Sequence, residues 1–284
     1  KCVLPTYSSH PKFTAMFIDE ARIAVTLNHP NIVQVYDFGR YNDDYYLAME
    51  FVEGMDLSRL LSLLVGRDGT LPVGDAIFVV QEVLKGLDYA HRKRDGDGEP
   101  LNIVHRDVSP QNVLISREGS VKITDFGIAQ SLFAEEDGEG VIKGKFAYMA
   151  PEQARGGAVD VRTDVFAAGI ILWEALCHRS LFNERQKLSK GGLDQVHLQA
   201  APAIRELIPE LPPALEAICA KSLSLEPEDR YPSAREMSSA LSHYLLSLEE
   251  VHDAFTLADQ MVQVEEVASS SAESSTGPMV IFTL

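Results

Sequence analysis

Apolar side chains recur at helical spacing near the start of the chain. Between residues 13 and 27 they follow one another three or four positions apart, at Phe13, Phe17, Ala21, Ala24 and Leu27. This spacing predicts one face of an α-helix, which the polar run NHPN at residues 28–31 ends. Glu20 falls on the same face, so we expect its carboxylate to point inward and to meet a cation, because an unpaired buried charge is costly. The alternative is a solvated position at the edge of that face.

Short apolar runs bounded by turn-forming residues predict strands farther along. Residues 32–38 and 45–51 are joined by the polar segment GRYNDD and are typical of a β-hairpin. A second hairpin is predicted for residues 113–116 and 121–124, because the segment REGS between them favours a turn. Each hairpin brings residues that are distant in the sequence to the same end of a strand pair.

Helical periodicity dominates the remainder of the chain. One long helix is predicted from an apolar face made of Ile77, Val80, Leu84, Leu87 and His91. The Gly- and Asp-rich residues 95–100 indicate an exposed loop after it. Residues 165–177 form the longest apolar run; Glu174 interrupts it, and it falls short of the ~20 residues of a membrane span, so we expect a buried helix. The pattern as a whole favours the α+β class, with a mixed first part and a mainly helical second part.

Composition narrows the class of protein. A length of 284 residues suits one large domain or two small lobes, and 45% hydrophobic with 24% charged residues is typical of a globular protein. The net charge of −17 argues against a nucleic acid or an anionic membrane as partner. Three distant cysteines indicate neither a disulfide framework nor a zinc site, and no secretory signal is visible. A cytoplasmic location is therefore expected.

The composition changes once, after residue 248. The following segment, residues 249–284, is acidic and Ser-rich, and its part SSSAESSTGP at residues 269–278 is small and polar throughout. Such a segment buries too little apolar surface to offset the entropy of ordering the chain. We expect this tail to be disordered.

Three oxygen-bearing side chains cluster around the second predicted hairpin. Asn112 directly precedes its first strand and Asp125 directly follows its last, so the two should lie together. Asp107 lies five residues before Asn112, close enough to share the site. Amide and carboxylate oxygens are the ligands that hard divalent cations prefer. The pattern therefore predicts a cation site at this end of the hairpin.

Three motifs occur in the order and spacing of the protein-kinase signatures: HRDVSPQN at residues 105–112, DFG at 125–127 and APE at 150–152. With them the chain resembles the catalytic domain of bacterial eukaryotic-like Ser/Thr protein kinases. The resemblance implies transfer of the ATP γ-phosphoryl group to Ser/Thr hydroxyls of proteins. It also implies a two-lobed fold, with an incomplete β-rich N-lobe at residues 1–52, a mainly helical C-lobe at 53–248 and the tail at 249–284.

The resemblance also implies roles for single residues. Asp107 would accept or orient the proton of the substrate hydroxyl, while Asn112 and Asp125 would hold Mg²⁺, or Mn²⁺ in its place, on the ATP phosphates. The opening KCVLP is similar to the stretch around the family's third-strand lysine. Lys1 would then contact the α and β phosphates and supply the cation for Glu20, unless it is a plain exposed chain end.

Four residues would surround the adenine base if the resemblance holds. Met49 resembles the gatekeeper in MEFV at residues 49–52, and Glu50 and Val52 would offer backbone hydrogen bonds to the base. Leu114 would form the floor beneath it. All four would belong to the nucleotide site.

Two further matches have a structural role in the family. Asp164, which precedes an apolar helix, resembles the aspartate that anchors the catalytic loop, and Arg230 resembles the partner of Glu152. The family's glycine-rich loop precedes the lysine by more than a dozen residues. Since this chain begins at Lys1, we expect that loop in a longer protein, of which the present sequence is a fragment.

The chain departs from the family in the charges around the catalytic loop. Ser109 stands where Ser/Thr kinases usually carry lysine, and Lys145 stands where they usually carry threonine. We hypothesise that the Lys145 ammonium replaces the missing charge near Asp107. Residues 132–147 contain no Ser, Thr or Tyr, but include Glu135, Glu136, Asp137 and Glu139. These acids would pair with Arg106 in place of an activating phosphate, or form a solvated loop.

Two other functions compete with an active protein kinase. A non-catalytic scaffold would keep the two-lobed shape and use it to bind a partner. A small-molecule kinase of the aminoglycoside type shares the spacing of Asp107 and Asn112, but the APE motif at residues 150–152 disfavours it, because protein kinases use that region to hold a peptide. The sequence leaves open the protein substrate, the activating signal and the oligomeric state.

Overall fold

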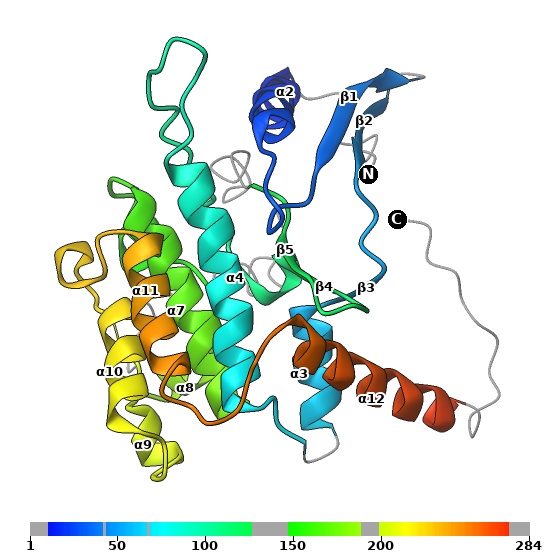
Figure 1. The fold of residues 1–284 in the computed structure, drawn as a ribbon. Helices are drawn as coiled ribbons and strands as arrows, with labels where there is room; N and C mark the ends of the chain where they lie inside the picture. Colours follow the sequence, from blue (N-terminus) through cyan, green and yellow to red (C-terminus); the bar gives the residue numbers. More distant parts are fainter. Residues whose placement is uncertain (1–10, 42–43, 67–68, 127–146, 189–198, 273–284) are drawn as a thin grey trace.

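The structure is a computed structural model that describes residues 11–41, 44–66, 69–126, 147–188 and 199–272. Two parts of different composition follow each other along the chain. A helix and a small β-hairpin lie at the top of Figure 1, and a larger bundle of helices lies below them. A short three-stranded sheet lies between the two parts. This arrangement is the α+β fold that the sequence pattern predicts.

The upper part contains helix α2 (Pro11–Thr26) and the antiparallel strands β1 (Val35–Tyr41) and β2 (Asp44–Met49) (Figure 1). The predicted helix and hairpin are confirmed, although both strands extend into the polar segment expected to connect them. The first strand also begins later than predicted. The residues before it bond to β5 instead, since Val33 N donates to Ile123 O at 2.9 Å and Ile123 N donates to Asn31 O at 2.9 Å.

The central sheet has the antiparallel order β3–β4–β5, with β3 at Gly54–Asp56, β4 at Val113–Ser116 and β5 at Val121–Ile123. The second predicted hairpin is therefore confirmed. Side chains along β4 and β5 point alternately to the two faces of the sheet. Those on the face toward the helices are buried, namely Val113, Ile115, Val121 and Ile123. The intervening Leu114 and Lys122 face the other side of the sheet and are only half-buried.

The lower part is helical. Its longer helices are α3 (Leu57–Val65), α4 (Val73–His91), α7 (Val161–Cys177), α8 (Leu181–Leu188), α10 (Pro213–Ser222) and α11 (Ala234–Leu245). Short helical turns occur at η1 (Pro110–Asn112), α6 (Pro151–Ala154), α9 (Ile204–Leu207) and η4 (Pro227–Asp229). The predicted apolar face of α4 is confirmed, because Ile77, Val80, Leu84 and Leu87 are all fully buried.

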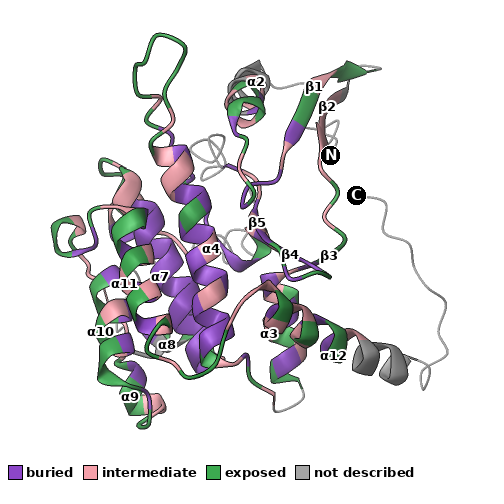
Figure 2. Ribbon diagram, in the orientation of Figure 1, coloured by how far each residue is buried: buried purple, intermediate pink, exposed green. Residues whose placement is uncertain are grey.

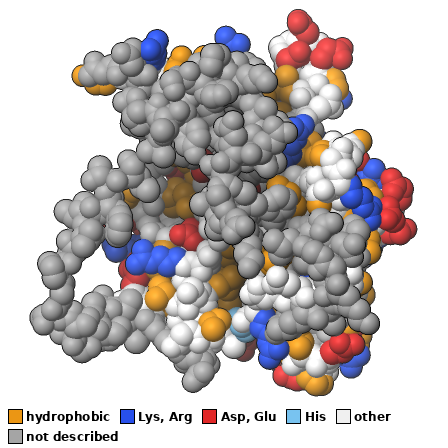
Figure 3. Space-filling model, turned by 180° about the vertical axis from the view of Figure 1, so that it is seen from behind, with side chains coloured by type: hydrophobic (Ala, Val, Ile, Leu, Met, Phe, Trp, Pro, Cys, Tyr) orange, Lys and Arg blue, Asp and Glu red, His pale blue; other side chains and the backbone are white. Residues whose placement is uncertain are grey.

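Helix α7 is the central element of the core. All of its residues from Thr163 to Cys177 are buried, and Figure 2 shows it enclosed by α4, α10 and α11. The buried helix predicted for residues 165–177 is thus confirmed. Among the helices that the structure describes, none is both long and apolar enough to cross a bilayer. In the view from behind, acidic and basic side chains lie among one another over the described surface (Figure 3).

A further helix, α12 (Ala254–Ala272), lies beside α3 at the end of the described chain (Figure 1). The expected disorder of residues 249–284 is therefore wrong for this stretch. Leu257, Met261 and Val264 are buried, and their spacing of four and three residues forms a continuous apolar stripe. The Ser-rich composition that suggested disorder begins only at residue 269, and residues 273–284 lie outside the described part.

The first turn of α12 is fixed to α4 by hydrogen bonds and packs closely against the turn between β4 and β5. Asp75, a buried residue of α4, accepts from Thr256 Oγ1 at 2.8 Å and lies 2.8 Å from His252 Nδ1. Asp253 caps the helix by accepting from the amide of Phe255 at 2.8 Å. The backbone also approaches Gly119, where an added Cβ would lie 1.7 Å from the carbonyl oxygen of Ala254.

We expect Gly119→Ala to destabilise the protein more than Gly98→Ala does. Both glycines have left-handed backbones, with φ of +80° and +88°, so each substitution costs about 1–2 kcal/mol of backbone strain. A Cβ at Gly98 meets no atom within 4 Å, whereas one at Gly119 must push away the first turn of α12, which adds about 1–3 kcal/mol. Urea unfolding of both variants measures the difference. Equal losses would mean that α12 does not dock at Gly119.

Candidate active site

Asp164 holds the backbone of the HRD motif from beneath. This residue lies in the first turn of α7 and is completely buried. Its carboxylate accepts from the amides of His105 and Arg106, each at 2.8 Å, and lies 2.8 Å from His91 Nε2 on α4. The predicted role of Asp164 as the anchor of this loop is confirmed.

Two of these partners, His91 and His105, also keep Asp164 ionised. Burial by itself would raise the pKa of this carboxyl, because the charged form loses its hydration. The hydrogen bond and charge of His91, together with the hydrogen bond from the amide of His105, outweigh that effect and hold the pKa below its ordinary value. The anchor is therefore a carboxylate at neutral pH.

The backbone brings the two predicted cation ligands together. Thr124 N donates to Asn112 O at 2.9 Å, so the residues on either side of this bond, Asn112 and Asp125, leave the hairpin at the same end. The side chain of Asn112 then turns back, and its Nδ2 donates to the carbonyl of Asp107 at 2.8 Å. Asp107, Asn112 and Asp125 are all half-buried. The backbone positions of the three residues therefore converge, as the hairpin geometry predicts.

His105 joins the two loops of this site, a role that the sequence analysis did not assign. Its Nδ1 accepts from Asp107 N at 3.2 Å, so Nε2 carries the proton and donates to Thr124 O at 3.0 Å. The ring is buried and lies 4.5 Å from the ring of Phe126, centroid to centroid. A histidine next to Arg-Asp, followed by a strand pair, is the signal that could have suggested it.

Two residues in the site have left-handed backbones. Arg106 has φ of +66° and Asp125 has φ of +58°, a conformation that costs free energy in residues other than glycine. Strain of this kind persists only where the surroundings fix it, and it is frequent at functional sites. Arg106 precedes the cluster residue Asp107 and Asp125 is itself part of the cluster, which indicates that the local backbone is shaped to direct side chains rather than for stability.

The donor set of the cluster fits a magnesium ion. Since Nδ2 of Asn112 is the atom that donates to Asp107, its Oδ1 is the atom it can offer to a cation, and Asp125 supplies a carboxylate. Within the described parts of the chain, no group of three or more His, Cys, Asp or Glu side chains could hold a metal. Magnesium is commonly held by one or two protein oxygens and completed by phosphate and water, so two donors suffice for nucleotide-bound Mg²⁺.

Three of the four residues expected around adenine, Met49, Glu50 and Val52, lie where β2 leads into the lower part, and the fourth, Leu114, lies on β4. Met49 is the last residue of β2, opposite Val35, and Leu114 faces away from the helical core. The amide of Glu50 is already used, since it donates to Gln34 O at 2.8 Å. Of the backbone groups of Glu50, only the carbonyl could therefore meet a base. Val52 follows two residues later and is half-buried.

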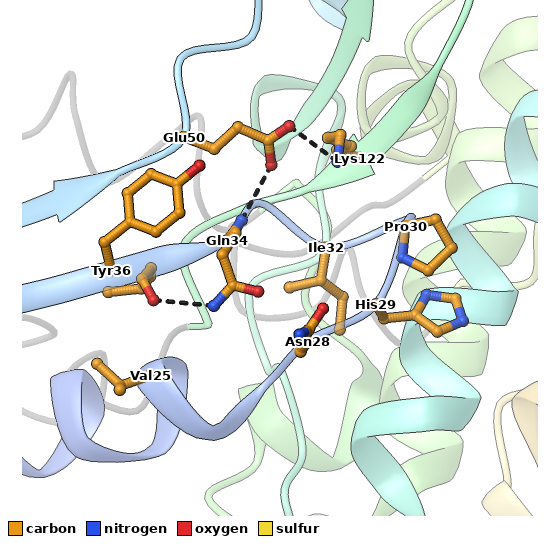
Figure 4. A pocket seen from close by; sticks show the side chains of 10 residues that line it. Val25, Asn28, His29, Pro30, Ile32, Gln34, Tyr36, Glu50 and Lys122 are labelled. Atoms are coloured by element: carbon orange, nitrogen blue, oxygen red, sulfur yellow. Dashed lines mark hydrogen bonds and ion pairs between the residues drawn. The ribbon is translucent and has the colours of Figure 1, made fainter.

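The side chain of Glu50 points away into a separate cavity of about 610 Å³ (Figure 4). There it pairs with Lys122 Nζ at 3.0 Å and accepts from Gln34 N at 3.2 Å. Val25 and most residues of segment 28–36, though not Asn31 or Val33, complete the lining, and none of Asp107, Asn112 or Asp125 contributes to it. This ion pair ties the segment after β2 to β5, the strand that leads to Asp125.

The APE motif is held by a buried ion pair. Arg230 forms two bonds of 2.8 Å with the carboxylate of Glu152, and Thr163 Oγ1 donates to the same carboxylate at 2.8 Å. Burial by itself would raise the pKa of Glu152. The hydrogen bonds from Arg230 and Thr163 have the larger combined effect, so the pKa lies below its ordinary value. The predicted pairing of Arg230 with Glu152 is confirmed.

Several predicted residues lie outside what the structure describes. These are Lys1, Lys145 and the acidic residues Glu135, Glu136, Asp137 and Glu139. The backbone of Glu20 belongs to α2, but its side chain is not described. The expected Lys1–Glu20 pair, the Lys145 hypothesis and the acidic partners of Arg106 therefore stay predictions.

Comparison with known proteins adds a family and a set of relatives. The sequence profile described as the protein kinase domain matches residues 3–245. The tyrosine-protein kinase MasK of Myxococcus xanthus is 43% identical over 247 residues, which cover 86% of this chain and 38% of that protein. The serine/threonine-protein kinase PrkC of Bacillus subtilis is 32% identical over 278 residues, or 94% of this chain and 40% of that protein.

A solved structure shows the same fold. The crystal structure of the PknI kinase domain of Mycobacterium tuberculosis superposes with a TM-score of 0.65 at 26% identity, and covers 86% of this chain and 84% of that one. The two-lobed architecture is therefore shared. The chain spans only about two fifths of the length of the curated relatives named above, which extend well beyond the matched part.

Proposed function

Since the chain belongs to the protein kinase family, we propose that it transfers the γ-phosphoryl group of ATP to Ser and Thr hydroxyls of proteins. The observation that carries this proposal is the convergence of Asp107, Asn112 and Asp125 at one end of the β4–β5 hairpin. Their scaffold is pinned by the buried carboxylate of Asp164. A non-catalytic scaffold protein would have no need of this set of oxygen ligands.

Each of the three residues has a distinct task. Asp107 accepts or orients the proton of the attacking hydroxyl, a contribution worth about 10²- to 10⁴-fold in rate. Asn112 Oδ1 and the carboxylate of Asp125 would hold Mg²⁺, which supplies charge neutralisation on the phosphates. Phosphoryl transfer asks the protein mainly for position, and the bonds from Asp164, His105 and Asn112 provide it.

The nucleotide base would bind between the lobes. Met49 stands at the gatekeeper position, the carbonyl of Glu50 and the backbone of Val52 would meet the adenine edge, and Leu114 would lie beneath it. The engaged amide of Glu50 supports a contact through its carbonyl. Residues 1–52 would form the N-lobe and 53–248 the C-lobe, with α12 added to the latter.

The phosphate charge would be met by lysines. Lys1 would pair with Glu20 and contact the α and β phosphates, and Lys145 would supply the positive charge that Ser109 does not. Because the reaction consumes ATP, we place this domain in the cytoplasm. The protein substrates and the partners of the whole protein are a matter for experiment.

A second candidate is transfer to tyrosine, which the name of the 43% identical relative from Myxococcus xanthus favours. Phosphoamino-acid analysis distinguishes the two. The protein made from its complete gene is incubated with labelled ATP and Mg²⁺, then hydrolysed. Labelled phosphoserine and phosphothreonine are expected. Label found in phosphotyrosine alone would replace the proposed specificity by the second one.

A further inference from the structure

The peptide groups around Asp107 are held by side chains on all sides. The amide of Arg106, the carbonyl of Arg106, the amide of Asp107 and the carbonyl of Asp107 each have a side-chain partner at 2.8–3.2 Å. Asp164 accepts from the amide of Arg106, and Gln153 donates to the carbonyl of Arg106. His105 accepts from the amide of Asp107, and Asn112 donates to the carbonyl of Asp107. Three of these partners belong to the catalytic loop or to its anchor in α7. Gln153 is different, because it comes from α6, directly after the APE motif.

The amide of Gln153 is used at both ends. Its Oε1 accepts from Ala150 N at 3.0 Å, which caps α6, and its Nε2 donates to Arg106 O at 3.0 Å. The orientation of the amide is fixed by these partners, since a backbone N–H only donates and a carbonyl only accepts. The neighbouring residue Glu152 forms an ion pair with Arg230, so the backbone that carries Gln153 is itself held in place.

The bond from Gln153 acts on one particular peptide unit. The carbonyl of Arg106 and the amide of Asp107 belong to the same planar peptide group, which Gln153 and His105 hold at opposite ends. Arg106, the residue that leads into this plane, has φ of +66°, a backbone conformation that costs free energy. Among the contacts of the described residues, the loss of Gln153 would leave this plane with a single side-chain bond, the 3.2 Å bond to His105. A rotation of this plane would change the direction of the Asp107 side chain.

We propose that Gln153 is a positioning residue for phosphoryl transfer. It ties α6, which follows the APE motif, to the peptide that carries Asp107, and so sets where that carboxylate meets the substrate hydroxyl. The inference rests on the proposed kinase activity. A misplacement of about 1 Å at a reacting group can cost about 10²-fold in rate, so a single hydrogen bond at this peptide is enough to matter.

Two substitutions separate the two bonds of Gln153. Gln153→Glu keeps an oxygen for Ala150 N, a favourable cap for α6, but sets a second oxygen against the carbonyl of Arg106. Gln153→Lys keeps a donor for Arg106 O and loses the acceptor for Ala150 N. If Gln153 only capped α6, the Glu variant would be fully active. If it positions Asp107, the Lys variant should be the more active of the two.

The test compares both variants with the native protein, made from the complete gene. For Gln153→Glu we expect a fall in kcat of about tenfold or more with little change in the KM for ATP, and for Gln153→Lys a smaller fall. Rates are expressed per ATP-binding site, so a partly unfolded preparation does not change them. A Glu variant with native kcat, or one that is faster than the Lys variant, overturns the inference.

Hydrogen exchange gives a readout that does not need activity. Measured by mass spectrometry without ATP, amide exchange in the peptide that contains Asp107 should accelerate in Gln153→Glu and stay near native in Gln153→Lys. Accelerated exchange in a protein that transfers no phosphoryl group would refute the proposed function while supporting the positioning by Gln153. Unchanged exchange in the Glu variant would refute the positioning.

Discussion

Replacing Asp107 with Asn is expected to lower kcat for phosphoryl transfer by about 10²- to 10⁴-fold. The amide has the shape of the carboxylate but cannot accept the proton of the attacking hydroxyl. The backbone of residue 107 bonds to His105 and Asn112 whichever side chain it carries, so the loop should keep its form. Affinity for Mg·ATP should therefore stay close to native. Steady-state kinetics and calorimetric titration with Mg·ATP measure the two quantities separately.

Asp97→Asn is the matched control for this substitution. Asp97 lies in the exposed loop after α4, and its removal takes away the same charge at a distance from the site. The control should have native kcat. An Asp107→Asn protein that retains most of its activity would show that this carboxylate is not the group that handles the proton.

Replacing Asp164 with Asn is expected to cost about 3–5 kcal/mol of stability and nearly all activity, because it breaks a buried charged network. The carboxylate accepts from the amides of His105 and Arg106 and meets His91. An amide side chain would present an N–H group to one of these donors. Denaturant unfolding measures the loss. Asp160→Asn, at the exposed N-cap of the same helix, should cost less than about 1 kcal/mol, because asparagine also caps helices and only the exposed ion pair with Arg162 is lost.

Asp164 also makes the stability of the folded protein depend on pH, and the direction of this dependence follows from its lowered pKa. Its pKa is below the ordinary value of 3.8 in the folded protein, so the unfolded chain binds a proton there at higher pH than the folded one. The stabilisation is complete above the ordinary carboxyl range and is lost as the pH falls through 3.8 towards the lower folded pKa. The pKa of Glu152 is lowered as well. Acid unfolding of Asp164→Asn should therefore depend less steeply on pH, while some dependence from Glu152 remains.

Local pattern was sufficient to predict the elements that carry the chemistry. The β4–β5 hairpin follows from two apolar runs around a Gly-containing turn, and its geometry alone places Asn112 beside Asp125. The buried helix α7 follows from an apolar run too long for a strand and too short for a membrane span. In both cases the signal lies within a few residues of the feature that it predicts.

Contacts between distant segments could not be predicted in this way. Gln153 reaches Arg106 from 47 positions away, and nothing in its own neighbourhood indicates that carbonyl. Helix α12 was missed because the Ser-rich end of the segment hid the stripe of Leu257, Met261 and Val264 before it. Its docking on Asp75 joins residues that are 177 and 181 positions apart. Tertiary packing decides such contacts.

The decisive measurement is the transfer of labelled γ-phosphate from ATP to protein by the product of the complete gene, with and without Mg²⁺. We expect transfer that requires the divalent ion and that is lost both in Asp107→Asn and in Asp125→Asn. Mg·ATP binding without any transfer would contradict a catalytic site at this hairpin and favour a scaffold. Transfer that survives both substitutions would place the chemistry elsewhere in the molecule.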